Sequence, residues 1–195
     1  MTAFLRRWHR DDAAALAEIY ARADEDLLNN IPDDPSLTGA QAWLEGIRTA
    51  EADGSTVALA IVRGDQTPVG NVMATAIDRR HSTAWISYWL DSNACGQGLA
   101  AAGLRSIVDH LHDELDVYRL EVGYRVNNPA SAAVAESAGF IVEGRQRERL
   151  RYDGVRYDTE ECARLVGDPR SLRRRLPILA SETASPDDDG GSESR

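Results

Sequence analysis

The sequence predicts an α+β protein in which a mixed, mostly antiparallel sheet carries helices on both faces. Two observations support this prediction. Three β-rich runs follow one another as a meander, and helical periods then alternate with further strands before a final hairpin. The chain has 195 residues, the size of one domain. We expect a domain over residues 1–168 and a charged, disordered tail over 169–195, which ends in a segment rich in Ser, Asp and Gly.

The first half of the chain gives helical periods and then strand patterns. A short strand is expected over residues 3–8. A helix capped by Asp11 or Asp12 follows, since apolar residues recur at a helical period from Leu16 to Leu27. Thr38 is expected to cap a second helix. Three runs rich in β-forming residues then predict an antiparallel meander, with turn-forming residues between the first two: Thr56–Arg63, Val69–Asp78 and Thr83–Leu90.

The second half alternates helices and strands. A loop with two glycines leads into a long helix with an apolar stripe that includes Leu104 and Leu111. A strand over residues 118–126 precedes a shorter helix, for which Pro129 is a plausible first residue. Asp153-Gly154 is a strong hairpin signal between two last strands. These strands are expected over Phe140–Tyr152 and Val155–Val166.

Charge and composition exclude several classes of protein. The 22 Lys and Arg against 32 Asp and Glu give a net charge of -10, so no nucleic-acid partner is expected. No stretch approaches the roughly 18 apolar residues of a transmembrane helix, and the start lacks the apolar part of a secretory signal. We therefore expect a cytoplasmic chain with no membrane partner. Cys95 and Cys162 lie far apart and match no disulfide framework or zinc signature, so no metal is expected.

The most informative stretch joins the third strand of the meander to the long helix. The strand ends at Trp89-Leu90, and Gly96 and Gly98 stand directly before the helix. Helix N-termini have unpaired N–H groups and the positive end of the helix dipole. Glycines let such a backbone approach a phosphate closely. The pattern fits the pyrophosphate of a dinucleotide or of coenzyme A, and a glycine turn that only reverses the chain gives the same pattern.

Further motifs stand at fixed distances beyond this loop. Asn128-Pro129-Ala130-Ser131 begins thirty residues after Gly98, and Gly139-Phe140 follows eleven residues after Asn128. With these motifs the chain resembles the GNAT (Gcn5-related) N-acetyltransferase superfamily over about residues 3–166. Within it the chain is most similar to the Rim-type ribosomal-protein N-acetyltransferases. The shared stretches are Tyr88–Leu90, Gly96–Gly98, Arg125–Ser131, Phe140–Gly144 and Asp153-Gly154.

The resemblance implies acetyl-CoA as the co-substrate and assigns residues to it. In this family the strand before the loop separates from its neighbour, and the backbone of Trp89 and Leu90 would pair with the pantetheine arm. Asn128 is expected to contact acetyl-CoA near the thioester, and it also fits as a helix cap through the N–H of Ser131. The pyrophosphate would meet the N–H groups of Cys95, Gly96, Gln97, Gly98, Leu99 and Ala100.

The resemblance also implies direct acetyl transfer to an amine in a ternary complex. Ser131 occupies the position from which Rim-type enzymes direct a hydroxyl at the coenzyme sulfur. The tyrosine that many members use as an acid is replaced by Ala135. Glu121 and Glu148 are the candidate bases for the ammonium proton. A surface charge on a strand is the more ordinary interpretation of either glutamate, and a chain of water molecules would also serve as the base. The family motif begins with Gln or Arg where this chain has Asn93.

The expected acceptor is an amine-bearing small molecule or a protein N-terminus of the ribosomal-protein kind. A homodimer is also expected, since the late hairpin often mediates dimer contacts in this family. Two alternatives stay open. One is a non-catalytic acyl-CoA-binding regulatory module, to which Asn93 and Ala135 point. The other is an N-acyltransferase for a different donor such as succinyl-CoA, which needs Arg125 or Arg145 near the acyl end.

Overall fold

The computed structural model describes residues 2–28, 31–32, 34–64 and 66–179, and it confirms the predicted fold class. In this part of the chain, seven strands form one sheet in the order β1-β2-β3-β4-β5-β7-β6. Neighbouring strands there are antiparallel, apart from β4 and β5, which run parallel. The strands are β1 (Ala3–Arg7), β2 (Val57–Arg63), β3 (Pro68–Asp78), β4 (Thr83–Leu90), β5 (Arg119–Arg125), β6 (Ile141–Tyr152) and β7 (Val155–Leu165).

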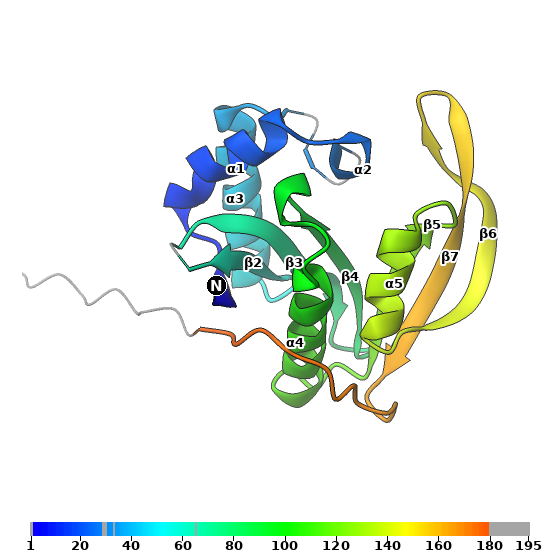
Figure 1. Cartoon of the computed structure of the whole chain (residues 1–195). Coiled ribbons are helices and arrows are strands. Elements are labelled where there is room, and N and C mark those ends of the chain that lie inside the picture. Colours follow the sequence, from blue (N-terminus) through cyan, green and yellow to red (C-terminus); the bar gives the residue numbers. More distant parts are fainter. Residues whose placement is uncertain (1, 29–30, 33, 65, 180–195) are drawn as a thin grey trace, which may run out of the picture.

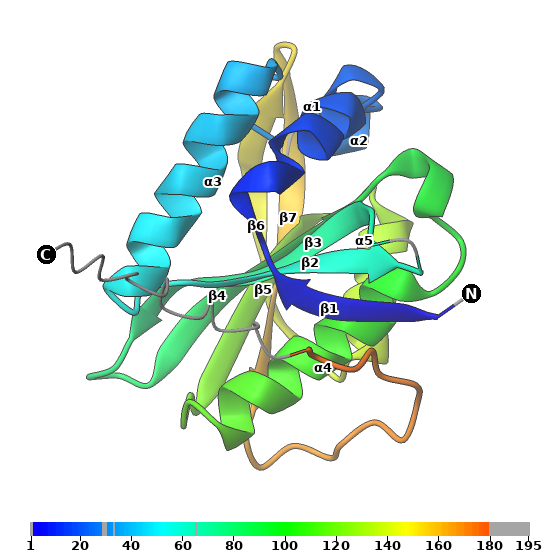
Figure 2. The same cartoon turned by 90° about the vertical axis from the view of Figure 1, so that its left-hand side faces the viewer.

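Helices cover both faces of the sheet (Figure 1, Figure 2). Helices α1 and α3 lie over β3 and β2 on one face, and α4 and α5 pack against the strands on the other face. None of the helices within the described ranges is long and apolar enough to cross a membrane. The helices are α1 (Ala13–Ala21), α2 (Glu25–Leu28), α3 (Leu37–Ala52), α4 (Leu99–Asp113) and α5 (Pro129–Ser137), with 3₁₀ turns η1 (Arg10–Asp12) and η2 (Ser92–Ala94).

Two large apolar clusters hold the layers together, one on each face. Between the sheet and α4, the side chains of Leu104, Ile107 and Leu111 are fully buried. These residues stand three or four positions apart, so the predicted apolar stripe of α4 faces the sheet. On the other face, Leu16 of α1 joins a cluster that includes Trp89 of β4. The end of β4 is therefore held from the α1 side while α4 begins on the opposite side.

Helix α1 begins directly after Asp12, one of the two predicted cap positions, but the start of α3 differs from the prediction. Helix α3 begins at Leu37, and its cap is Ser36, whose hydroxyl accepts the N–H of Gly39 at 3.2 Å. Thr38 is therefore a residue of the first turn, because the serine two positions earlier already provides the extended backbone and the oxygen of a cap. The helical period predicted over residues 16–27 is divided between α1 and α2.

Residues 169–179, which the sequence assigns to the tail, pack along α4 (orange in Figure 1). Leu176 is only 2% exposed. Its backbone N–H and C=O bond the buried hydroxyl of Ser106 at 2.9 and 2.7 Å. The folded part of the chain thus continues beyond residue 168, because Leu176 of this arginine-rich segment is buried and the backbone of Pro177 and Leu179 bonds that of Leu5 in β1. The remainder of the predicted tail, 180–195, lies outside the described residues.

Candidate functional site

Strands β4 and β5 pair over only part of their length. The paired residues end at Trp85 of β4 and Glu121 of β5. Both strands continue past this point, so backbone groups of β4 that face β5 have no partner strand there. The sequence predicted that the strand carrying Trp89 and Leu90 separates from its neighbour, and this prediction is confirmed.

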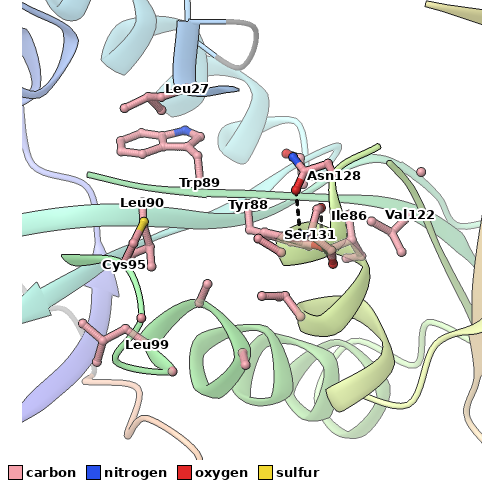
Figure 3. A pocket seen from close by; sticks show the side chains of 18 of the residues that line it. Leu27, Ile86, Tyr88, Trp89, Leu90, Cys95, Leu99, Val122, Asn128 and Ser131 are labelled. Atoms are coloured by element: carbon pink, nitrogen blue, oxygen red, sulfur yellow. Dashed lines mark hydrogen bonds between the residues drawn. The ribbon is translucent and has the colours of Figure 1, made fainter. Parts of the chain in front are cut away.

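A cavity of about 510 Å³ occupies the opening (Figure 3). Its walls come from β4, β5, α2, and the first turns of α4 and α5. Figure 3 shows Trp89 pointing toward Leu27 on one side of β4, while Cys95 and Leu99 lie on the other side. The cavity therefore passes through the sheet. The residues predicted to bind coenzyme that line it are Trp89, Leu90, Cys95, Gly96, Gly98, Leu99, Ala100, Asn128 and Ser131.

The loop between β4 and α4 presents backbone N–H groups at one end of this cavity. Gly96 and Gly98 have φ of +74° and +69°, and no atom lies within 4 Å of where a Cβ would stand. The N–H of Ala102 bonds the C=O of Gly98, so the N–H groups before it have no intrahelical acceptor. This geometry suits an anion. Gln97 does not line the cavity, and its side chain accepts a hydrogen bond from Arg63 at 3.0 Å.

A buried carboxylate fixes the start of this loop. Asp91 is 4% exposed, and its side chain accepts hydrogen bonds from Arg22 of the α1 end at 2.6 Å and from the N–H of Asn93 at 3.1 Å. Burial raises the pKa of Asp91, but the hydrogen bonds from Arg22 and Asn93 and the charge of Arg22 outweigh it, so the pKa lies below its ordinary value. The side chain stays ionised and ties the loop to α1.

Ser131 stands in the first turn of α5, where two neighbours hold it (Figure 3). The side chain of Asn128 accepts the N–H of Ser131 at 2.9 Å, which confirms the predicted cap. The hydroxyl of Tyr88 lies 2.9 Å from the Ser131 hydroxyl, where either group can be the donor, and 2.8 Å from the Ser131 carbonyl oxygen. Burial raises the pKa of Tyr88 to about 12, against the opposing effect of the hydrogen bond with Ser131.

Tyr88 was not among the residues predicted for the site. An aromatic residue on a strand is ordinarily a core residue, and local pattern does not show that this hydroxyl meets α5. The one available signal was alternation. Because Trp89 faces α1 and α2, its neighbour Tyr88 must face α4 and α5, where Ser131 was expected.

Neither of the predicted bases lines the cavity. Glu121 faces away from the buried side chains of β5, as alternation predicts, and it pairs with Arg119 at 2.6 Å. The same guanidinium pairs with Glu143 at 2.5 Å. Glu148 is exposed on β6 at an irregularity in the strand pairing. The described ranges contain no group of three or more His, Cys, Asp or Glu side chains arranged to hold a metal ion.

An opened sheet beside a glycine-rich helix start defines a protein that can hold an extended ligand with an anionic end. Residues 3–141 match the family model described as "Acetyltransferase (GNAT) domain". The chain belongs to the GNAT acetyltransferase family, which confirms the family resemblance found in the motifs.

Two curated relatives each match a part of this chain. The "Probable N-acetyltransferase YjcK" of Bacillus subtilis (strain 168) is 37% identical over 86 residues, covering 44% of this chain and 48% of the relative. The "Ribosomal-protein-serine acetyltransferase" of Escherichia coli (strain K12) is 36% identical over 91 residues, covering 45% and 51%. The match spans about half the length of these relatives.

Solved structures match over most of the chain. RimL, described as "Ribosomal L7/L12 alpha-N-protein acetyltransferase in complex with Coenzyme A", has a TM-score of 0.77 at 25% identity, covering 85% of this chain and 94% of that one. Mycobacterium smegmatis RimJ in complex with CoA-disulfide has a TM-score of 0.75 at 28% identity, covering 84% and 81%. Both structures hold a coenzyme A species, and both proteins share the fold of this chain.

Proposed function

We propose that the chain transfers the acetyl group of acetyl-CoA to a primary amine by direct attack in a ternary complex. One observation carries the proposal. The cavity between β4 and β5 meets a row of backbone N–H groups at one end and the Ser131 hydroxyl farther along. An anion-binding end and a reactive end are thus joined by a channel whose wall includes unpaired strand backbone.

The donor site would use mainly backbone groups. The pantetheine arm carries amides, which would extend the sheet beside Trp89 and Leu90 in the way that a peptide adds a strand. The pyrophosphate would rest on the N–H groups at the start of α4, where glycines leave open space. Those N–H groups would come from Gly96, Gln97, Gly98, Leu99 and Ala100. The N–H of Cys95, predicted with them, already bonds the C=O of Ser92 at 3.3 Å.

Ser131 and Asn128 would act at the thioester end. Asn128 fixes the turn that carries Ser131, and Tyr88 holds the serine hydroxyl. A serine hydroxyl is a weak acid, so it would orient the leaving sulfur or relay a proton rather than supply one alone. Backbone N–H groups of the opened strand would stabilise charge on the carbonyl oxygen, an effect worth roughly 3–4 kcal/mol per donor in other enzymes.

The proposed acceptor is the N-terminal amine of a ribosomal-protein-like chain, or a small-molecule amine. The names of the Escherichia coli relative and of the RimL structure support the protein acceptor. A homodimer through the late hairpin remains part of the proposal.

The positions of Arg125 and Arg145 do not favour the succinyl-CoA alternative, which requires one of them near the acyl group. Arg125 stacks over the rings of Tyr152 and Tyr157, 5.2 Å from each centroid, and Arg145 pairs with Asp158 at 2.7 Å. Neither arginine lines the cavity. The following experiment distinguishes the enzyme from the non-catalytic acyl-CoA-binding module.

The test is a coenzyme-thiol release assay on the purified chain, with acetyl-CoA and a panel of N-terminal peptides, polyamines and amino-acid amides. Mass spectrometry of the acceptor accompanies the assay. We expect thiol release that depends on the amine, together with an acetylated product. Saturable acetyl-CoA binding without transfer to any amine would overturn the proposal in favour of a binding module.

A further inference from the structure

We infer that Glu161 receives the ammonium group of the acceptor beside the ring of Trp85 and takes its proton. This inference rests on the proposed function, and it names a residue that neither the motifs nor the comparisons assign. It also places the amine on the face of the sheet opposite α4 and α5, so that donor and acceptor enter the opening from different sides.

Glu161 lies beside Gly123, a residue of the cavity wall that has no side chain. It lies on β7 directly opposite Gly123 of β5, and Gly123 lines the cavity. A Cβ at Gly123 would stand 3.2 and 3.3 Å from the two carboxylate oxygens of Glu161, and 3.1 Å from Cη2 of Trp85. Trp85 also lines the cavity. Because Gly123 has no side chain, the indole of Trp85 and the carboxylate of Glu161 both lie over the backbone of β5 beside the cavity wall, although Glu161 does not itself line the cavity.

The carboxylate of Glu161 has no cationic partner among the residues that the structure describes. Its hydrogen bond there comes from the buried hydroxyl of Thr159, at 3.3 Å. Glu161 is half-buried, and a carboxylate in such a place gains from a positive charge. Glu121, in contrast, already pairs with Arg119. Of the glutamates on this face, Glu161 is thus better placed than Glu121 to accept a cation from the channel.

Charged groups flank Glu161 along the same face of the sheet. Arg119, Glu121 and Glu143 form one ion-pair network toward the paired end of β5. Arg125 lies toward the hairpin, stacked on two tyrosine rings. These groups lie on neighbouring strands, and Trp85 supplies the aromatic surface, 37% exposed, against which an alkyl ammonium can rest.

The proton transfer balances as follows. An N–H bond of the ammonium breaks as an O–H bond forms on Glu161, which leaves a neutral amine. Its lone pair forms the C–N bond to the acetyl carbon, and the C–S bond breaks. The second amine proton passes to the sulfur at the Ser131 end, and Glu161 returns the first proton to solvent. The products are an amide and a free thiol, and the reaction needs no oxidant or reductant.

The test compares Glu161→Gln with the matched control Glu121→Gln, using a serine-initiated tripeptide amide and spermidine as acceptors. At about pH 7 we expect E161Q to lower kcat/KM for the amine by roughly 100-fold or more, the usual share of a general base. For the tripeptide amide the loss should shrink at about pH 9, because its α-amino group, with a pKa near 8, is then already neutral. For spermidine the loss should persist, because alkylamines stay mostly protonated at that pH. E121Q should stay close to the wild-type rate, and calorimetry should show unchanged acetyl-CoA affinity in both variants.

A second variant, Glu161→Asp, keeps the charge and should recover part of the rate. E161Q with the wild-type rate and intact coenzyme binding would overturn the role of Glu161 and leave the proposed function standing. An equal loss at every pH with the tripeptide amide would overturn the proton transfer. A wild-type chain that binds acetyl-CoA and acetylates neither acceptor nor any other amine would overturn the proposed function, and this inference with it.

Discussion

Replacing Gly98 by alanine tests the anion site at the start of α4. Gly98 has φ of +69°, and an L-residue in this region costs about 1–2 kcal/mol of folding free energy. The added methyl meets no protein atom within 4 Å, so it would stand in the open space at the cavity wall. We expect the acetyl-CoA dissociation constant to rise about tenfold, or ~1.4 kcal/mol, slightly less than one charge-assisted hydrogen bond.

Gly154, in the β6–β7 turn, provides the matched control. It has φ of +84°, again with no atom within 4 Å of a Cβ, and it does not line the cavity. Gly154→Ala should therefore lose a similar free energy of unfolding in urea and keep the wild-type affinity in calorimetric titration. The bulkier Gly98→Val should raise the KM for acetyl-CoA further. A G98A chain that is destabilised like G154A but binds acetyl-CoA as tightly as the wild type would refute the anion site.

Three further predictions concern other contacts. Ser131→Ala should lower kcat more than coenzyme affinity, and Tyr88→Phe should do the same to a smaller degree, as steady-state kinetics and calorimetry can measure. Asp91→Asn should lower the free energy of unfolding at neutral pH by less than the roughly 3–5 kcal/mol of a fully buried pair, because Arg22 is 43% exposed. Since folding lowers the pKa of Asp91, this stability is present above about pH 4 and is lost as pH falls through the lower folded pKa. The free energy of unfolding of the variant should therefore depend less on pH in the acid range. A chain ending at residue 168 should melt at a lower temperature than one ending at 179, because it exposes the Leu176 site.

Each of these predictions has an outcome that contradicts it. Wild-type turnover in S131A would remove the serine from the chemistry. If the free energy of unfolding of D91N falls with decreasing pH as steeply as that of the wild type, the Asp91 pair contributes nothing to pH-dependent stability. Equal melting temperatures for the two shortened chains would show that Leu176 contributes little to the domain.

Local pattern was sufficient for most of the elements and for one part of the site. The bounds predicted for Thr83–Leu90 match β4, since its β-rich run ends at a polar loop. The cap at Asn128 also follows from neighbouring residues, because Pro129 fixes the first helical position. Such features depend on residues a few positions apart, which the sequence displays directly.

Contacts between distant segments could not be predicted in the same way. Tyr88 and Ser131 are forty-three positions apart, and their contact depends on how α5 packs beside the opened strand. The local pattern also did not show where the side chain of Glu121 ends. In the structure it pairs with Arg119 and does not line the cavity. The buried position of Leu176 could not be predicted from composition, since three arginines stand directly before it.

A crystal structure of the chain with coenzyme A is the most direct test of the claim that the opening between β4 and β5 receives the donor. We predict the pyrophosphate within hydrogen-bond distance of the N–H groups between Gly96 and Ala100, and the sulfur beside the Ser131 hydroxyl. A coenzyme bound elsewhere, or β4 and β5 paired along their whole length, would contradict the claim.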